Sequence, residues 1–345
     1  MDATPVKRRD STIAAKAYLA RAGLLVALLV TASPARSANG DILSREPFRP
    51  TLGYGDWFAR AFAPSDEPLD PKPDLARARA YYTPTLYRAL IRQHDVIAER
   101  ITYESDGLRI AGLVVRPRRP IGRLPVILWC RGGIGAIGGI TLGDVLVMSN
   151  WARAGYVVIA TNYRGGPRSG GHDEDGGADV DDATALVPLA SALPYADIRN
   201  LFLYGQSRGG MMVYRALAEG VPAKAAAVNS GVTDISRNDR PDAADMDALA
   251  RAAMPDYAIE VANHFCRRSV ICWPDKINAP LLLLHGTADW RVPAAQVIDF
   301  AARLQAFGKP YELHMVERGT HVWLDQDQAA IDRAVLAFFK AHAAS

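Results

Sequence analysis

The chain has 345 residues, of which 49% are hydrophobic and 22% charged, a composition typical of a folded globular protein and not of a disordered one. Its formal net charge is +3, but residues 1–37 hold six basic and two acidic side chains, which leaves about −1 for the rest. This near-neutral remainder argues against a nucleic-acid partner, which would need a broad basic surface.

The first predicted element is an export signal over residues 1–37. A basic start is followed by the apolar stretch "AGLLVALLVTA" and by small residues up to Ser37, the layout of a secretory signal peptide cleaved after that residue. The uncharged stretch between Arg21 and Arg36 has about 14 residues, fewer than the roughly 18–20 of a spanning helix. We therefore expect export to the periplasm or the medium, without stable membrane insertion after cleavage. An uncleaved anchor is the main alternative.

Two regions are expected after the leader. Residues 38–95 are rich in Pro and aromatic residues and show helical periodicity from Leu75 to Ile91, which predicts an N-terminal helical or irregular segment. A second domain, residues 96–345, begins with two strands, 97–103 and 108–115, joined by the turn signal Asp106-Gly107.

The second domain then alternates apolar strands with amphipathic helices, which predicts an α/β fold with a mostly parallel sheet covered on both faces. The hairpin would add antiparallel edge strands. The strands are expected at 126–130, 157–161, 201–204, 225–229, 280–285 and 311–316, and the helices at 144–154, 180–193, 209–218, 294–307 and 328–341.

Residues 231–278 interrupt this alternation with no strand, which predicts a lid or substrate wall. Tyr257, Phe265 and Trp273 are its candidate wall residues. Cys266 and Cys272, both in this segment, could form a local disulfide in an exported protein. Cys130 ends an apolar strand and is expected as a buried thiol, and no cysteine spacing indicates zinc.

The strongest chemical signal is the pattern Gly205-Gln-Ser207-Arg-Gly209, which stands between a predicted strand and helix. This is the context of a nucleophile elbow, in which a tight turn projects the serine. Asp289 and His321 follow later strands, and the carboxyl ends of parallel strands share one edge of a sheet. We therefore predict Ser207 as nucleophile, Asp289 as orienting acid and His321 as base, with an acyl-enzyme and neither metal nor cofactor.

Other polar candidates are weaker. His285 and His314 lie within or at the end of strands and are interpreted as satisfied core groups. The acidic run "GGHDEDGG", which contains His172, is interpreted as a solvated loop, with a metal site as the weaker alternative.

Several motifs occur together in the order found in one family. "NYRGG" (162–166), "YGQSRGGMM" (204–212), "NAPLLLLHGTADWRVP" (278–293) and "GTHVW" (319–323) resemble the catalytic domain of the prolyl oligopeptidase family of serine peptidases, an α/β-hydrolase. The resemblance runs from about Val126 to the end and implies the same triad, acting on peptide, amide or ester bonds. Such peptidases often carry a β-propeller before this domain, for which residues 38–120 are too few.

The chain departs from the family pattern at the proposed oxyanion site, because relatives often have His or Tyr where this chain has Arg131. We expect the backbone N–H of Arg208 as one donor. The second should come from backbone N–H groups around Arg131 and Gly132, or from the Arg131 side chain. Residues expected to line the substrate pocket are Tyr163, Trp290 and Trp323.

Three alternatives stay open. The same triad could serve a carboxylesterase. Gly133-x-Gly135-x-x-Gly138 also matches a dinucleotide fingerprint, with Arg164 as a partner for a 2′-phosphate, but helical periodicity begins only near Asp144, too late for a Rossmann loop. The third alternative is a non-catalytic binding protein on this fold. The natural substrate, exo- or endo-cleavage and the oligomeric state are left undetermined.

Overall fold

A computed structural model describes residues 38–64, 74–135, 138–237, 248–249, 251–254, 261–321 and 328–344. All of them belong to one compact unit, Ser37–Ser345. The predicted export signal lies outside the described residues. None of the described helices is long and apolar enough to cross a bilayer.

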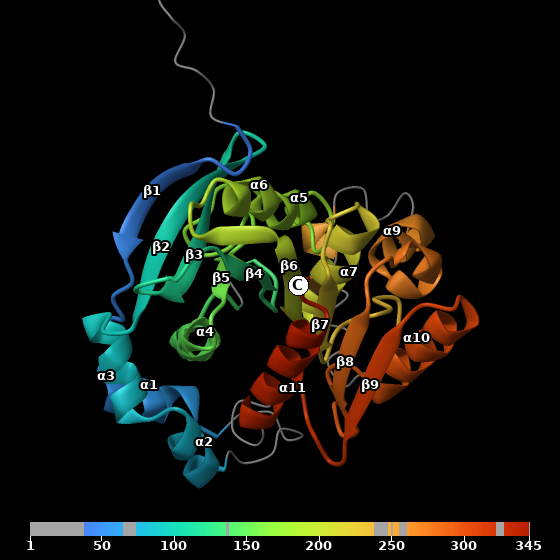
Figure 1. The fold of residues 1–345 in the computed structure, drawn as a ribbon. Coiled ribbons are helices and arrows are strands. Elements are labelled where there is room, and N and C mark those ends of the chain that lie inside the picture. The colour runs from blue at the N-terminus through green and yellow to red at the C-terminus, as the bar shows by residue number, and fades with distance from the viewer. Residues whose placement is uncertain are drawn as a thin grey trace, which may run out of the picture. The chain divides into compact units, whose positions relative to one another are not determined.

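A nine-stranded sheet runs through this unit in the order β1-β2-β3-β5-β4-β6-β7-β8-β9 (Figure 1). β1, β2, β3 and β5 pair antiparallel, and the strands from β5 to β9 pair parallel. The predicted mostly parallel sheet with an antiparallel hairpin at its edge is thus confirmed. The strands are β1 Ile42–Pro47, β2 Val96–Ser105, β3 Leu108–Pro117, β4 Leu124–Cys130, β5 Val157–Thr161, β6 Ala196–Gln206, β7 Ala225–Asn229, β8 Leu281–Gly286 and β9 Tyr311–Val316.

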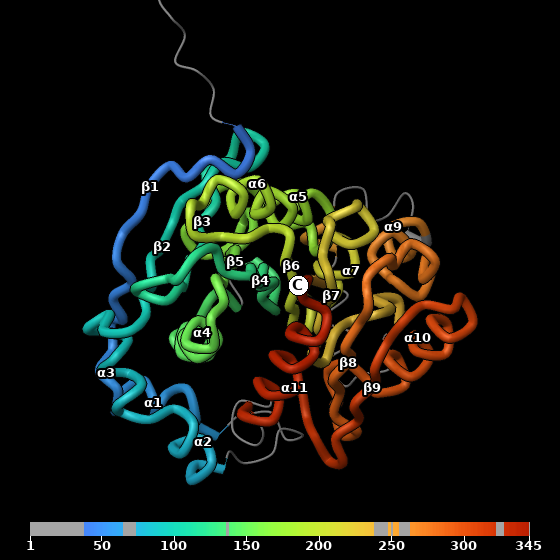
Figure 2. Tube along the Cα trace, in the orientation of Figure 1, coloured from blue at the N-terminus to red at the C-terminus, as the bar shows by residue number. Residues whose placement is uncertain are grey.

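Helices cover both faces of the sheet, as the tube in Figure 2 also shows. Successive residues of β4 point to opposite faces of the sheet. Leu128 belongs to the apolar core that includes residues of α5, α6, α7 and α10. Trp129 belongs to the second core, which includes residues of α1 to α4 and α11. The helices are α1 Tyr54–Ala61, α2 Leu75–Tyr81, α3 Pro84–Arg92, α4 Leu142–Arg153, α5 Asp179–Thr184, α6 Leu186–Ser191, α7 Arg208–Ala218, α9 Val261–Arg268, α10 Ala294–Ala306 and α11 Gln328–Ala341, with 3-10 turns at Val270–Cys272 and Pro274–Lys276.

The N-terminal segment differs most from its sequence prediction. β1 and α1 were not expected, and the helix expected from Leu75 to Ile91 is broken into α2 and α3. The break falls at Thr83, whose side chain accepts a hydrogen bond from the Leu86 N–H at 3.1 Å and caps α3. Pro84 follows at the first helical position, where it disfavours a helical conformation for Thr83. Phe58 of α1 and Leu90 of α3 belong to the same core as strand β4, so this segment packs on the sheet.

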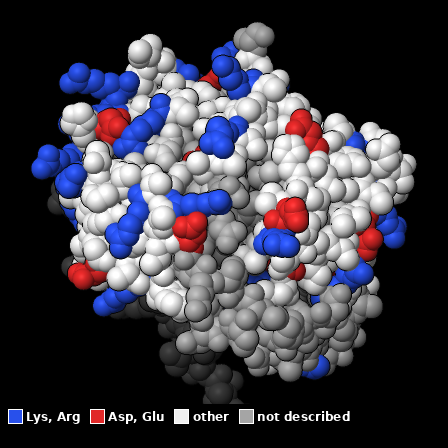
Figure 3. All heavy atoms as spheres, turned by 90° about the horizontal axis from the view of Figure 1, so that it is seen from below, with Lys and Arg blue, Asp and Glu red and all other residues white. Residues whose placement is uncertain are grey.

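Charged side chains on one face of the molecule are interspersed, with basic and acidic groups close to each other (Figure 3). No broad field of one sign is visible on the described part of that face.

The turn from β6 into α7 is packed so closely that its glycines cannot be replaced. A Cβ on Gly205 would lie 2.2 Å from the Gly209 carbonyl oxygen, and one on Gly209 would lie 2.0 Å from the Cys130 carbonyl oxygen. Both partners are backbone atoms, which cannot turn away as a side chain could. The spacing Gly-x-Ser-x-Gly is therefore a packing requirement of this turn against β4.

We expect Gly209→Ala to lower the free energy of unfolding by about 3 kcal/mol or more, because of that overlap. Urea denaturation followed by circular dichroism measures it. Gly55→Ala is the matched control, since a Cβ there meets nothing within 4 Å and alanine favours the helix. Equal stability of the two variants would contradict the packing account.

Candidate active site

Ser207 stands at the carboxyl edge of the sheet, between the end of β6 and the start of α7. Its backbone has φ 57° and ψ −126°, a conformation that costs energy for a residue with a side chain. The turn is held by hydrogen bonds from the Ser207 N–H to Asn229 O (2.9 Å) and from the Gly210 N–H to Ser207 O (2.9 Å). These bonds hold the strained backbone in place. The serine side chain therefore stays above the helix N-terminus, where negative charge is favoured.

The structure brings Ser207, His321 and Asp289 together from the ends of β6, β9 and β8. His321 Nε2 lies 2.8 Å from Ser207 Oγ, and His321 Nδ1 lies 2.9 Å from Asp289 Oδ2. His321 and Asp289 are buried, at 6% and 5% exposed. The arrangement has the hydrogen-bond order nucleophile, base, orienting acid that acyl transfer requires.

The surroundings of Asp289 favour its ionised form. Its Oδ1 accepts backbone hydrogen bonds from Arg291 (3.0 Å) and Val292 (2.9 Å). Burial opposes the charge, but hydrogen bonding and the proximity of His321 outweigh it and hold the pKa of Asp289 below its usual value. The carboxylate can therefore accept from His321 Nδ1 and fix the tautomer that leaves Nε2 free to take a proton from Ser207.

Two further histidines were interpreted as core groups from the sequence. His285 is fully buried, and its Nε2 lies 2.8 Å from Val292 O and 3.4 Å from Asp289 Oδ2. Burial lowers the pKa of His285, which favours the neutral ring. The interpretation of His314 was wrong, since its side chain is about half exposed beside Glu312.

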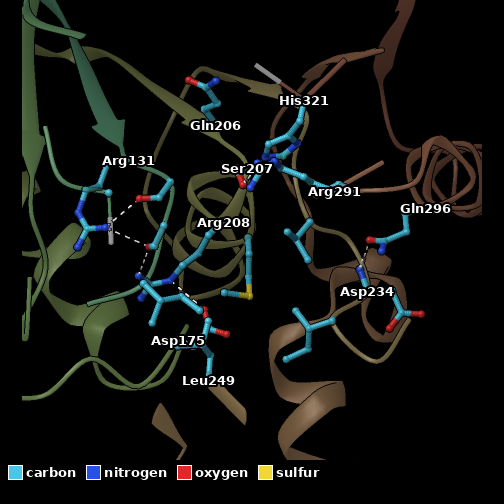
Figure 4. A pocket seen from close by; sticks show the side chains of 18 of the residues that line it. Arg131, Asp175, Gln206, Ser207, Arg208, Asp234, Leu249, Arg291, Gln296 and His321 are labelled. Carbon is cyan, nitrogen blue, oxygen red and sulfur yellow. Dashed lines mark hydrogen bonds and ion pairs between the residues drawn. The ribbon is translucent and has the colours of Figure 1, made fainter. Parts of the chain in front are cut away.

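A cavity of about 470 Å³ opens beside Ser207 and His321 (Figure 4). One wall is the loop that follows β4, and the opposite wall includes Asp234, Arg291 and Gln296. The described part of the insertion 231–278 also contributes to the lining. Its apolar contributors are Val232, Ile235, Leu249, Met254 and Phe265.

Two of the aromatic residues predicted to line the substrate pocket, Tyr163 and Trp290, do not line this cavity. Tyr163 is fully buried and does not line the pocket, so its prediction is corrected. Trp290 does not line it either and packs instead on the guanidinium of Arg291, with 4.4 Å from Cζ to the ring centroid. Trp323 and Tyr257 lie outside the described residues. Trp273 donates from Nε1 to Cys266 O at 2.8 Å and belongs to the core, whereas Phe265, among the described residues of the insertion, lines the pocket.

The loop after β4 passes directly beside Ser207. A Cβ on Gly132 would lie 3.2 Å from Ser207 Cβ and 3.8 Å from its Oγ, so a side chain there would crowd the serine. The Arg131 guanidinium, offered from the sequence as one possible oxyanion donor, points into the loop. It donates to Gly132 O (2.8 Å), Gly133 O (3.0 Å) and Asn162 O (2.7 Å). This geometry favours the backbone N–H groups over the Arg131 side chain as the second donor.

The acidic run near His172 is not the solvated loop that the sequence predicted. Asp173, Asp175 and Asp179 are buried and surround the side chain of Arg208, the residue after Ser207. Burial opposes the charge of Arg208, but these three carboxylates hold its pKa above the usual value. Burial raises the pKa of Asp175 to about 6 although Arg208 opposes the shift. No sequence periodicity signals this cluster, although an arginine inside an elbow needs buried acidic partners somewhere in the chain.

The dinucleotide interpretation of the glycine loop finds no support. Arg164, its proposed phosphate partner, is paired by Nη2 to Asp182 Oδ1 and Asp106 Oδ2, both at 2.8 Å. The next helix begins only after Thr141, which caps α4. In the described residues, no three His, Cys, Asp or Glu side chains are grouped to hold a metal ion.

The structure forms the disulfide that the sequence left open and confirms the buried thiol expected for Cys130. Cys266 and Cys272 form a disulfide across α9 and the turn that follows it. Cys130 is a buried free thiol, and burial raises its pKa to about 12.

Known proteins with similar sequences share this domain. The family model described as "Prolyl oligopeptidase family" matches residues 144–345, more than half of the chain. The peptidase YtmA of Bacillus subtilis is 29% identical over 243 residues, which cover 70% of this chain and 92% of YtmA. The human acylamino-acid-releasing enzyme is 25% identical over 247 residues, 65% of this chain but 32% of that enzyme.

Solved structures share the fold. Acylaminoacyl peptidase of Pyrococcus horikoshii superposes with a TM-score of 0.63 at 22% identity, over 74% of this chain and 43% of the other. An acetyl xylan esterase from Paenibacillus sp. R4 gives 0.58 at 18% identity, over 72% of this chain and 84% of the other. The chain thus spans most of YtmA and less than half of the larger peptidases.

Proposed function

Because the chain belongs to the prolyl oligopeptidase family, whose members are serine-type peptidases, we propose that Ser207, His321 and Asp289 form its catalytic triad. His321 takes the proton from Ser207 as Oγ attacks a peptide, amide or ester carbonyl, and later returns a proton to the leaving group. Asp289 holds the imidazole and stabilises its protonated form. Water then hydrolyses the acyl-enzyme by the same route. The hydrogen bond of 2.8 Å between His321 Nε2 and Ser207 Oγ is the observation that carries this proposal.

The oxyanion of the tetrahedral intermediate is stabilised by backbone N–H groups in this proposal. One belongs to Arg208 at the start of α7, and the other to the Arg131–Gly132 stretch, which passes within contact distance of Ser207. Each such donor lowers the activation free energy by an amount on the order of 3 kcal/mol in comparable sites.

The substrate is a small peptide, amide or ester that carries an apolar group. The cavity beside Ser207 is lined by Met211, Val232, Met254 and Phe265, which suit an apolar side chain or acyl chain. The described part of the insertion 231–278 lines the cavity, whereas no described residue of 38–92 does, so the insertion is the segment that we expect to filter access.

A carboxylesterase is the second candidate, because ester and amide cleavage use the same triad. This candidate is supported by the fold shared with a bacterial acetyl xylan esterase, because the superposition covers 84% of the esterase chain. The experiment compares kcat/KM on p-nitrophenyl esters with that on aminoacyl and peptidyl p-nitroanilides. We expect measurable cleavage of both. Ester cleavage alone would remove the peptidase proposal in favour of the esterase.

Export is part of the proposal and is supported by two observations. Residues 1–37 have the layout of a signal peptide. The disulfide between Cys266 and Cys272 suits an oxidising compartment outside the cytoplasm. Fractionation of cells that express the full chain, with immunodetection of the shortened protein outside the cytoplasm, tests it. A full-length protein in the cytoplasm would contradict it.

A further inference from the structure

The loop Arg131–Gly135 has to hold a fixed backbone without the support of a helix or sheet. It follows β4, and Gly133 and Gly135 have φ of 74° and 53°, which glycine adopts readily but does not enforce. An oxyanion donor must stay within a few tenths of an ångström of its position to be effective. The loop therefore needs partners elsewhere in the chain to fix it.

Two guanidinium groups bind the carbonyl oxygens of this loop. Arg131 donates to Gly132 O, Gly133 O and Gly135 O at 2.8, 3.0 and 3.3 Å. Arg208 reaches across from the elbow and donates from Nη1 to Gly133 O at 2.7 Å. Figure 4 shows both side chains beside the loop, on the side of the cavity occupied by Asp175.

One carboxylate joins the loop to the elbow. Asp173 Oδ2 accepts from the Gly135 N–H at 2.7 Å and from Arg208 Nη1 at 2.9 Å, and Asp173 Oδ1 accepts from Arg208 Nη2 at 2.7 Å. Asp173 is 4% exposed. A buried, bidentate, charge-assisted pair of this kind has little freedom of orientation.

The ring of Tyr163 lies close to both arginines. Cζ of Arg131 lies 5.0 Å and Cζ of Arg208 lies 5.1 Å from the ring centroid, within the range of cation–π contacts. The Tyr163 hydroxyl donates to Arg131 O at 3.2 Å. Tyr163, expected from the sequence to touch substrate, instead supports the side chains that hold the loop.

We propose that Asp173 is a positioning residue for the oxyanion hole: through Arg208 and Gly135 it fixes the two backbone segments that donate to the oxyanion. This inference rests on the proposed function. Asp173 does not touch the substrate and acts by keeping the Arg208 and Arg131–Gly132 N–H groups at their separation. Its loss should therefore impair the stabilisation of the tetrahedral intermediate more than the binding of the substrate.

The test is Asp173→Asn, which keeps the size but places an amide NH₂ against Arg208 or against the Gly135 N–H. We expect kcat to fall about 10²-fold, the order of a lost oxyanion donor, with KM changed by less than about threefold. The affinity for a peptide boronic acid, which forms a tetrahedral adduct on serine, should fall in parallel with kcat. The affinity for a product that forms no adduct should stay the same.

Asp182→Asn is the matched control. Asp182 is fully buried and binds Arg164 through Nε (3.0 Å) and Nη2 (2.8 Å), and none of its hydrogen bonds within the described residues reaches the loop 131–135. It should lose stability as Asp173→Asn does and keep kcat. Asp173→Glu, which retains the charge, is the second variant if the asparagine variant does not fold, and its kcat should fall less, with KM again preserved.

The outcomes separate this inference from the proposed function. An unchanged kcat in a folded Asp173 variant, a loss confined to KM, or an equal loss of kcat in Asp182→Asn would overturn the positioning role while leaving the triad intact. A wild-type protein that reacts neither with substrate nor with a fluorophosphonate would remove the proposed function, and this inference with it.

Discussion

Replacing Ser207 by alanine should lower kcat by roughly six orders of magnitude, because within the described residues Ser207 supplies the hydroxyl that is bonded to His321. The Oγ–Nε2 distance of 2.8 Å and the strained backbone at φ 57° place this side chain alone at the head of the triad. Alanine fits the same turn, so the fold should persist. Removal of the Oγ contact should cost little stability, since the strain at this position remains.

A fluorophosphonate probe measures the effect directly, because it labels the activated serine and needs no knowledge of the substrate. The wild type should be labelled and Ser207→Ala should not. Ser149→Ala is the control, since Ser149 is buried in α4 with its hydroxyl bonded to Val145 O at 2.7 Å, and it should label normally. Labelling of the Ser207 variant at the wild-type rate would assign the nucleophile to another residue.

The turn at Ser207 and the meeting of Ser207, Asp289 and His321 could be predicted because their positions follow from local patterns. Each of Ser207, Asp289 and His321 comes after an apolar strand, and parallel strands end at one edge of the sheet, so separation along the chain did not matter. The glycines at 205 and 209 were readable for a similar reason, since close backbone packing leaves a sequence signature.

The support of the oxyanion loop could not be predicted. Asp173 and Arg208 are 35 residues apart, and their pairing has no periodicity. An acidic run beside glycines is usually solvated, and only the buried charge of Arg208 draws this one inside. Tyr163 was misplaced because nearness in sequence to a strand end does not show which way a side chain points. The sequence also did not reveal the strand β1 and the helix α1, since such short elements owe their stability to tertiary packing.

Asp289→Asn should lower kcat about 10⁴-fold, although asparagine has almost the same shape. The backbone N–H groups of Arg291 and Val292 donate to Oδ1, so they will bind the amide oxygen of asparagine in that place. The amide NH₂ then faces His321 Nδ1, where Oδ2 stood at 2.9 Å. An NH₂ there requires Nδ1 as acceptor, which puts the ring proton on Nε2. A protonated Nε2 cannot accept the proton of Ser207.

The loss should therefore appear in kcat on an activated ester and in the rate of fluorophosphonate labelling, with KM little changed. Glu46→Gln is the control, since Glu46 pairs with Arg168 at 2.8 Å on the exposed surface, where such pairs contribute about 1 kcal/mol or less. That variant should keep the wild-type kcat. A rate near wild type in Asp289→Asn would mean that catalysis does not need this carboxylate to fix the tautomer of His321.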